Sequence, residues 1–447
     1  MLVSELFKTK KLIKNYTMNS QKYILIVCIA LILSSCNTSP EKITNTSDYD
    51  TYIELAENKT LQNAMIDNEF WKHKLEKAPN QFPYISKIAA TYSHLFAATG
   101  KIEYLKKAEE ELVKVNEITG YNNPSFLMSL SVNYISQHKF KESLELLTKV
   151  ELIGDRLSDV QKMLFDVHLE LGNNDLAKLY LEKIKNMNDF DYLIRLAKWS
   201  DHQGDLDSAI KYLEKARVIA ESSNLSSIKQ WTYTNLADFY GHSGDIKASY
   251  NHFLKALEID PNDAYAKKGI AWIVYSYEKN PDEALRILNS ITTTFFAPDY
   301  YLLKAEIFEY KGDIVSKNEQ LKLYERAVAD TLYGDMYNKY NVFLYTDENK
   351  KIDEAIAIAK IEVEHRPTPQ SYVLLAWAYY SNGNIDDALN IVNQHIIGHT
   401  YEPSALYHSA EIYKEAGETE KANALKKELL ESAYELGPLV AEKVNQL

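Results

Sequence analysis

Residues 233–261 read YTNLADFYGHSGDIKASYNHFLKALEIDP, and this stretch decides the fold. Apolar and small residues recur every three or four positions on both sides of the segment GHSGD, which predicts two amphipathic helices joined by a turn. The positions are Tyr233, Leu236, Ala237 and Tyr240 in the first helix and Ser249, Phe253 and Ala256 in the second. Gly244 supplies the turn, and Pro261 ends the unit because proline cannot continue a helix. The stretch is therefore predicted to be a helical hairpin.

The same pattern recurs along most of the chain. Clear copies are GDLDSAIKYLEKA from Gly204 and NGNIDDALNIV from Asn382. A small residue marks each copy and stands five places after a turn glycine in six of the ten, and successive marks lie 32 to 40 residues apart. The marked positions are Ala108, Ser143, Ala177, Ala209, Ser249, Ala284, Lys317, Ala355, Ala388 and Ala422. Three copies depart further from the pattern: Lys317 stands at a small position, Lys279 replaces the turn glycine before Ala284, and the copy at Ala108 has about three extra residues after Gly100.

This repeat resembles the tetratricopeptide repeat (TPR), a helix-turn-helix unit of about 34 residues, over roughly residues 85–435. The resemblance implies an all-α fold, an α-solenoid superhelix of about ten TPR units that is open and right-handed, with a concave face made mainly by the first helix of each unit. Small residues on facing turns let two antiparallel helices approach to about 8–10 Å. Hairpins this short are stabilised by stacking on their neighbours.

The flanks of the repeat are assigned from composition. Residues 51–84 contain EFWKHKLEKAP, which is apolar at helical spacing, and they predict an N-terminal capping helix or partial repeat. Residues 36–50 are small and polar, so we expect a flexible tether. Residues 436–447 are expected to be a C-terminal tail.

The front of the chain has the features of a secretion signal. Tyr23 to Leu33 is an apolar run of 11 residues, too short for a bilayer span of about 20 residues but long enough for the apolar core of a signal peptide. The following LSSC, ending at Cys36, resembles the lipobox of bacterial lipoproteins, and this resemblance implies that Cys36 is lipidated and becomes the first mature residue. Residues 18–35 are then the signal peptide, and residues 1–17 precede the true start at Met18.

The resemblance implies a lipid-anchored protein of the bacterial cell envelope. Asn37 after the cysteine favours the outer membrane. The alternative is a short membrane anchor or a cleaved signal with an incidental cysteine. Cys28 lies within the signal, so the mature chain keeps Cys36 alone and forms no internal disulfide.

Net charge argues against nucleic-acid binding. The whole chain carries −13, while its first 36 residues hold five lysines and one glutamate, which leaves −17 for the remainder. Nucleic-acid affinity comes mainly from lysine and arginine contacts to phosphates. We therefore expect protein partners in the envelope or periplasm, reached from a membrane to which the chain is anchored by lipid.

Two groups of side chains are expected on the concave face. An aromatic group near the C-terminus is the candidate partner-binding site, since tyrosine and tryptophan are favoured at binding hot spots. It comprises Tyr337, Tyr340, Trp377, Tyr380 and Tyr407. Ordinary packing, including packing against an adjacent superhelical turn, is the alternative for these residues.

The second group lies in the middle of the array and is acidic, with histidines. It comprises Asp166, Glu170, Asp201, His202, Asp238, His242, Glu306 and Glu309. A solvated polar face explains these residues better than a metal site, since stacked repeats hold equivalent histidines too far apart to share one ion. HIIGH at His395–His399 has metal-ligand spacing, but its glycine and the approaching Pro403 indicate a loop.

No catalytic motif is present, because phosphate-binding loops, HExxH and a complete nucleophile elbow are all missing. We therefore expect no enzyme activity, no catalytic residue, no cofactor and no metal. Three functions remain: a protein-protein interaction scaffold, a surface lipoprotein that binds a glycan or peptide, and a purely structural envelope component. A basic or aromatic-rich peptide would suit an acidic and aromatic groove.

Overall fold

The structure is a computed structural model that describes residues 42–54 and 57–447. Every regular element in these ranges is a helix, so the expected all-α fold is confirmed. Cys36, the predicted signal peptide of residues 18–35 and residues 1–17 lie outside the described residues. None of the described helices is both long and apolar enough to span a bilayer.

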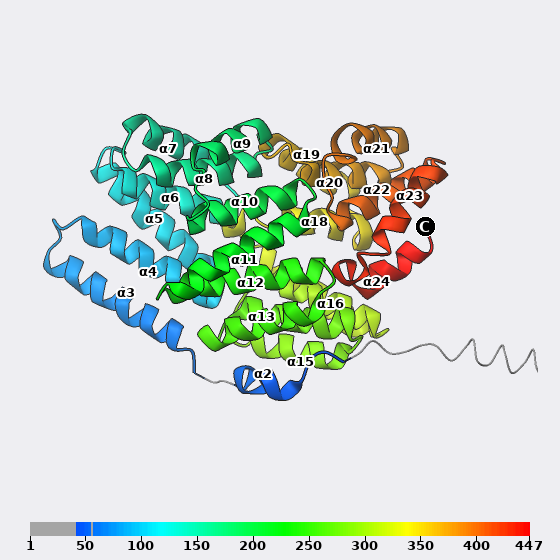
Figure 1. The fold of residues 1–447 in the computed structure, drawn as a ribbon, viewed down its shortest axis with the longest axis horizontal. Coiled ribbons are helices and arrows are strands. Elements are labelled where there is room, and N and C mark those ends of the chain that lie inside the picture. Colours follow the sequence, from blue (N-terminus) through cyan, green and yellow to red (C-terminus); the bar gives the residue numbers. More distant parts are fainter. Residues whose placement is uncertain (1–41, 55–56) are drawn as a thin grey trace, which may run out of the picture. The chain divides into compact units, whose positions relative to one another are not determined.

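The described part of the chain starts with two helices and continues as successive antiparallel pairs (Figure 1). The first helices are α2 (Thr46–Ile53) and α3 (Lys59–Lys77). The early pairs are α4 (Pro83–Thr99) with α5 (Ile102–Ile118), α6 (Pro124–Ser136) with α7 (Phe140–Ile153), α8 (Leu157–Glu170) with α9 (Asn174–Lys183), α10 (Phe190–His202) with α11 (Leu206–Ser222), and α12 (Ser226–His242) with α13 (Ile246–Ile259).

The later pairs include short π-helical segments, labelled η1, η3 and η4, and one 3-10 turn, η2. They are α14 (Ala264–Trp272) and η1 (Ile273–Tyr277) with α15 (Pro281–Ile291), α16 (Asp299–Tyr310) with α17 (Ile314–Val328), then η2 (Thr331–Tyr333), α18 (Asn338–Phe343) and η3 (Leu344–Glu348) with α19 (Ile352–His365), α20 (Pro369–Ser381) with α21 (Ile385–Ile391) and η4 (Val392–Ile396), and α22 (Pro403–Glu415) with α23 (Thr419–Leu429). A last helix, α24 (Ala433–Asn445), follows.

The hairpin of α12 and α13 shows why the repeated sequence folds this way. Gly244 takes φ +83°, and the Asp245 side chain accepts a hydrogen bond from the backbone N–H of Ala248, so the turn and the start of α13 are both fixed locally. Ala237 and Ser249 are fully buried where the two helices meet. Large side chains would hold the helices apart at this point.

The repeat copies that contain Lys317 and Lys279 depart from the sequence pattern for local structural reasons. Lys317 is buried along its aliphatic stem, while its ammonium reaches Glu309 at 2.9 Å and Glu348 at 2.6 Å. Lys279 takes the left-handed conformation with φ +57° where other copies have glycine, and the first helix of that unit ends in the π-helical segment η1. Lys350 also takes the left-handed conformation, with φ +53°, just after the π-helical segment η3.

Residues 44–53 correct the predicted tether of residues 36–50. From Thr44 onward the chain is docked rather than flexible: the Thr44 backbone N–H donates to Glu278 at 2.6 Å, and the Tyr49 hydroxyl donates to Glu283 at 2.9 Å. Tyr49 is only 1% exposed. Polar side chains of this segment make hydrogen bonds to the repeats, so the prediction of a flexible tether is wrong for residues 44–50.

Successive turns of the superhelix pack on each other, which corrects the expectation of an open one. The turn glycines of α4, α8 and α10 approach Phe296, Pro367 and Tyr401, and the residues in each contact are 195 to 197 positions apart. The Phe296 backbone N–H donates to the Thr99 carbonyl at 2.7 Å. Figure 1 shows that α8 to α10 lie beside α19 and α20, roughly six repeats later. We call this line of contacts the seam.

The C-terminal residues also differ from expectation, since the predicted tail of residues 436–447 belongs to α24. This helix packs on α22 and α23, and it also contacts α12, α16 and η1. Ser276 donates a hydrogen bond to the Tyr434 carbonyl at 2.6 Å. Helix α24 therefore covers first helices that would otherwise belong to the concave face.

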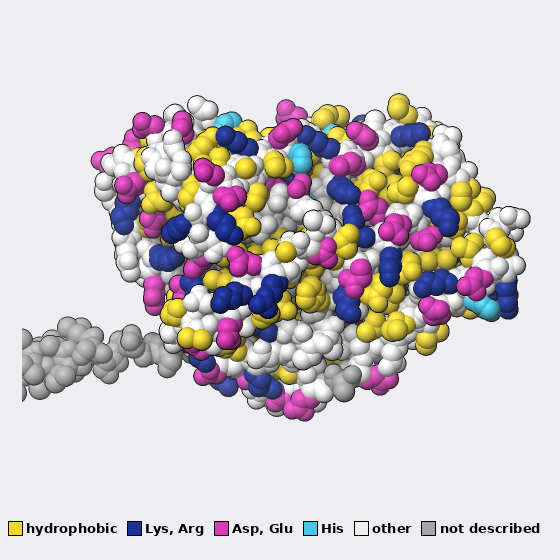
Figure 2. Space-filling view, turned by 180° about the vertical axis from the view of Figure 1, so that it is seen from behind, with side chains coloured by type: hydrophobic (Ala, Val, Ile, Leu, Met, Phe, Trp, Pro, Cys, Tyr) yellow, Lys and Arg dark blue, Asp and Glu magenta, His cyan; other side chains and the backbone are white. Residues whose placement is uncertain are grey.

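Charges of both signs are dispersed over the face shown in Figure 2, where Lys and Arg side chains alternate with Asp and Glu. No large patch of one sign is visible on that face. Several carboxylates of the predicted acidic group instead line cavities between helices.

Candidate functional site

A cavity of about 660 Å³ lies between α18–η3, α20, α22 and α24. We call it the aromatic pocket. Its aromatic and apolar lining comprises Trp377, Tyr407, His408, Leu436 and Val440. Its charged lining comprises Lys339, Asp347, Glu348, Lys350, Glu402, Glu411, Glu435 and Lys443. A cavity with aromatic walls and a few polar groups is the usual form of a binding site.

Trp377 is held in one orientation by three neighbours. Its indole Nε1–H on α20 donates a hydrogen bond to the Asp347 carboxylate on η3 at 2.8 Å. Its ring stacks on Tyr380 with centroids 4.7 Å apart, and the edge of His408 meets it at 4.5 Å. These contacts fix the indole before any partner arrives, which lowers the entropic cost of binding.

His408 is a neutral side chain in this pocket. Burial lowers its pKa to about 4, against the opposing effects of the Ser404 carbonyl and Asp347. Its ring lies on Phe343 with centroids 4.7 Å apart, and Nδ1 lies 2.6 Å from the Ser404 carbonyl oxygen. A neutral imidazole must donate from Nδ1 to that carbonyl, which leaves Nε2 as an acceptor.

Tyr407 contributes less surface than the sequence indicates. Its side chain is only 8% exposed and packs in a core with Leu406, Ala410 and Leu429. Burial and the neighbouring Glu411 carboxylate raise the pKa of its hydroxyl, so it stays protonated and able to donate. Tyr407 therefore supports the pocket wall and offers mainly its polar end.

The structure brings together Trp377, Tyr380 and Tyr407 of the predicted aromatic group, but places Tyr337 and Tyr340 elsewhere. Tyr337 is the residue before α18 and packs against Tyr333 and Tyr340, with ring centroids 5.1 and 5.9 Å away. It also packs with Ile102 and Leu105 of α5, from the preceding superhelical turn. The alternative for the aromatic group was packing against an adjacent superhelical turn, and Tyr337 packs in that way.

Sequence reasoning missed His408, Phe343 and the α24 residues Leu436 and Val440. His408 follows Tyr407 directly, so the concave positions of the TPR pattern pass over it. Leu436 and Val440 lie beyond the last repeat, where no periodic signal predicts a contact with α20 or α22.

The acidic and histidine group is divided between ion pairs and cavities at the seam. Asp166 pairs with Arg195 at 2.6 Å, and Glu170 pairs with Lys198 at 3.1 Å and with Arg366 at 2.7 Å across the seam. Asp201, His202 and His242 line a seam cavity of about 260 Å³ together with Glu402 and Glu435. Burial, with Glu402 nearby, raises the pKa of Asp201.

No group of three or more histidine, cysteine or acidic side chains within residues 42–54 and 57–447 is arranged to hold a metal ion. His395 of the HIIGH segment lies in η4, and its ring stacks on Tyr372 with centroids 3.8 Å apart. His395 is thus occupied in packing between repeats.

The geometry of the hairpins, with small residues at their contacts, defines a class of protein. The sequence profile of the tetratricopeptide repeat family matches residues 232–263, the hairpin of α12 and α13. The chain therefore contains the tetratricopeptide repeat, within an α-solenoid fold. Proteins of this fold are typically interaction scaffolds that use extended concave surfaces.

Known proteins similar to this chain contain the same repeat. A TPR repeat-containing protein of Methanocaldococcus jannaschii is 26% identical over an alignment of 253 residues that covers 51% of this chain and 42% of that protein. The chain thus aligns with less than half the length of that curated relative.

Solved structures of low identity are also similar. A tetratricopeptide repeat protein from Parabacteroides merdae is 16% identical with a TM-score of 0.37 and covers 56% of this chain and 97% of its own. Yeast Tom70 is 14% identical with a TM-score of 0.33, covering 90% and 94% of the two chains. The human IFIT1 dimer with m7Gppp-AAAA is 15% identical with a TM-score of 0.45, covering 73% and 75%. All three scores lie below 0.5, and none of these proteins bears on the function of this chain.

Proposed function

We propose that the protein is a lipid-anchored protein of the bacterial cell envelope, held in the outer membrane through Cys36, and that its TPR superhelix binds other envelope or periplasmic proteins. Two sequence features support the anchor: the apolar run from Tyr23 to Leu33 and the lipobox-like LSSC that follows it. The net charge of −17 after residue 36 favours protein partners over nucleic acid.

The anchor is tested by replacing the cysteine. Cys36→Ser should abolish incorporation of radiolabelled palmitate and release the protein from the membrane pellet, because the acyl chains supply the binding energy of about 0.8 kcal/mol per buried methylene. Cys28→Ser is the matched control and should leave both readouts unchanged, since that residue lies within the predicted signal. Retention of the Cys36→Ser protein in the membrane would contradict the anchor.

The observation that carries the scaffold proposal is the aromatic pocket. Trp377 and His408 present an indole and an imidazole acceptor at a cavity of about 660 Å³, and both rings are already fixed by neighbours. Pre-ordered aromatic side chains are the usual anchors of protein interfaces. A partner segment would place an apolar or aromatic side chain against Trp377 and a donor near His408.

Crosslinking in living cells, followed by identification of the captured chains, tests this site. Trp377→Ala should lose at least one specific partner, since a buried hot-spot aromatic contributes about 2 kcal/mol or more. Trp231→Ala is the matched control, because Trp231 is 40% exposed on α12 and lies outside the aromatic pocket. Identical partner sets for wild type, Trp377→Ala and Trp231→Ala would rule out the pocket as the docking site.

A surface lipoprotein that binds a glycan is the second candidate, because stacked Trp377 and Tyr380 also suit a sugar ring. Glycan arrays with the purified protein separate the two functions. Saturable sugar binding that Trp377→Ala removes would favour the glycan function over the protein scaffold.

A further inference from the structure

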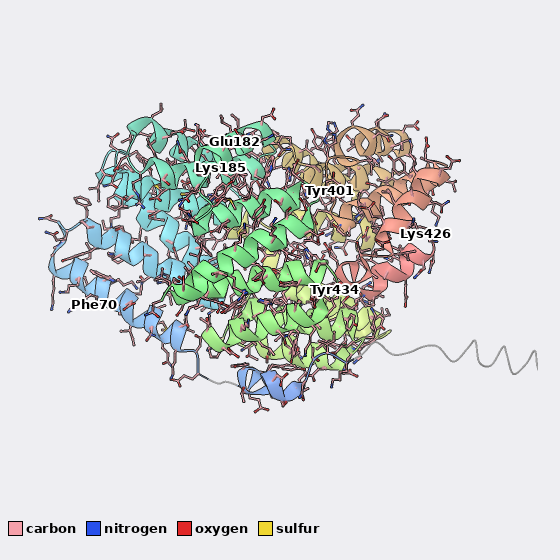
Figure 3. The ribbon with its side chains drawn as sticks, in the orientation of Figure 1. Phe70, Glu182, Lys185, Tyr401, Lys426 and Tyr434 are labelled. Carbon is pink, nitrogen blue, oxygen red and sulfur yellow. The ribbon has the colours of Figure 1, made fainter. Side chains whose placement is uncertain are left out.

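A smaller cavity of about 200 Å³ lies apart from Trp377, between α12, α13, α14 and α24. We call it the inner pocket. Its aromatic walls are Phe253, Tyr265, Trp272 and Tyr434, and its carboxylates are Asp238 and Glu435. Tyr434 reaches α12 from the far end of the chain, and Figure 3 labels it beside that helix.

Two glycines make room for the aromatic walls. A Cβ at Gly269 of α14 would lie 2.1 Å from the Phe253 ring, and a Cβ at Gly241 of α12 would lie 2.9 Å from the Tyr434 ring. Both glycines are helical, so space for the rings, and not backbone conformation, is what they provide here. The rings are therefore seated against backbone on two sides.

The pocket has an excess of negative charge. Asp238 accepts a hydrogen bond from the Tyr265 hydroxyl at 2.6 Å, and no ion pair is formed by Asp238 or Glu435 with any residue in the described part of the chain. Lys268 and His242 also line the pocket, and the Lys268 ammonium is held by Asp299 at 3.1 Å. Two carboxylates thus share the cavity with a lysine that is already paired.

The inner pocket also contains a buried hydroxyl group, that of Ser249, that lacks a hydrogen-bond partner within the described chain. Ser249 lines the inner pocket and is fully buried, and its Oγ has no hydrogen-bond partner among the described residues. The Tyr434 hydroxyl lies close to it. An unpaired buried polar group costs about 1–3 kcal/mol, so such groups are usually satisfied by water or by a ligand.

We propose that the inner pocket binds a primary alkylammonium group, with Asp238 and Glu435 as its charge partners, Ser249 as a hydrogen-bond acceptor and the rings of Tyr265, Trp272 and Tyr434 around it. An ammonium is attracted to the face of tryptophan and tyrosine rings. Its N–H groups also suit carboxylate and hydroxyl oxygens, which distinguishes it from a quaternary amine. The ammonium belongs either to a lysine side chain of a protein partner or to a free alkylamine.

Calorimetric titration of the full-length protein in detergent tests the proposal. The probes are 1,5-diaminopentane, for a free amine, and Nα-acetyl-lysine methylamide, for a protein lysine; 1-pentanol is the neutral control. At least one amine should bind saturably while 1-pentanol does not. Binding of only one amine identifies the source of the ammonium, and binding of both supports the shared chemistry.

Variants test the two carboxylates, and Asp238 is the one that separates the inner pocket from the aromatic pocket and the seam cavity, which Glu435 also lines. Asp238→Asn and Glu435→Gln should each weaken amine binding at least tenfold, while Glu182→Gln on α9, labelled in Figure 3, should bind as wild type does. Two carboxylate variants are used so that a folding defect in one, seen as a lowered melting temperature, leaves the other to decide. Wild-type protein that binds neither amine, or folded carboxylate variants that bind as tightly as wild type, would overturn the proposal.

The pH dependence gives an independent readout. Burial raises the pKa of Asp238 to about 6, opposed by the Tyr265 hydrogen bond, His242 and Lys268. Glu435 and Tyr434 face it from α24. A protonated carboxyl loses its attraction for an ammonium, so amine affinity should fall as the pH is lowered from 7.5 to 5, and a flat profile would contradict the role of Asp238.

Discussion

Single glycines decide how closely successive turns of the superhelix approach at the seam. A Cβ at Gly204 would lie 2.7 Å from the Tyr401 ring, and one at Gly100 would lie 2.2 Å from the Phe296 carbonyl oxygen. Gly204 also has φ +77°, a conformation that other residues adopt at a cost of about 1–2 kcal/mol. Both the backbone conformation and the contact therefore require glycine at these turns.

Alanine substitutions separate these two requirements. Gly312 has φ +75° but nothing within 4 Å of a Cβ, so Gly312→Ala reports the backbone cost alone. We expect Gly204→Ala to lower the free energy of unfolding by a further 1–3 kcal/mol or so, because overpacking at the seam adds to that cost. Urea denaturation of the two variants measures the difference. Equal destabilisation would mean that the seam contact contributes nothing to stability.

At the scale of the helices, the sequence predicts what is local. The period of the apolar residues and the small marker positions are set by contacts within one hairpin, so the helix pairs follow from the pattern. The π-helical segments η1 and η3 cannot be predicted from this pattern, although Lys279 marks a unit in which the turn glycine is missing. How the helix adjusts to that absence depends on the packing of Ile273, Val274 and Tyr275, which are fully buried.

The two end helices show the limit of that reasoning. Helices α2 and α24 contact elements roughly 160 to 240 residues away, through bonds such as Tyr49 to Glu283 and Ser276 to Tyr434. Contacts at such separation leave no periodic trace in a single sequence. The aromatic pocket combines predictable and unpredictable parts. Trp377 and Tyr380 lie on one predicted helix, whereas Leu436 belongs to a segment that was expected to be a tail.

At the scale of the whole chain from residue 44 onward, α24 changes the environment of the concave face. A Cβ at Gly437 would lie 2.9 Å from the Trp272 ring and 3.0 Å from Glu306 Oε1. Glu306 is thus enclosed between α16 and α24, where Tyr275 donates a hydrogen bond to it at 3.1 Å. A position expected on a solvated groove is thus a half-buried carboxylate enclosed by two helices.

This enclosure predicts an unusual pH dependence of stability. Burial raises the pKa of Glu306 from 4.5 to about 7, with Glu309 adding to the shift and the Tyr275 hydrogen bond and Lys443 opposing it. The folded state therefore holds this proton more tightly than the unfolded state. Its contribution to stability is fully present below pH 4.5 and is lost as the pH rises through about 7, the reverse of an ion-paired carboxylate.

Replacing Glu306 with glutamine removes the charge and keeps an acceptor for the Tyr275 hydroxyl. Glu306→Gln should be more stable than wild type at pH 8 by about 3 kcal/mol, and the gain should fall to roughly half at pH 5.5, because it vanishes only below pH 4.5. Histidines with lowered pKa, such as His408, oppose the trend in both proteins and cancel in the difference. Thermal unfolding at the two pH values measures this difference in stability. Glu319→Gln is the control, because Glu319 is exposed on α17. A gain that is equal at both pH values would mean that Glu306 is ionised in the folded protein throughout, and that α24 does not shield it from water.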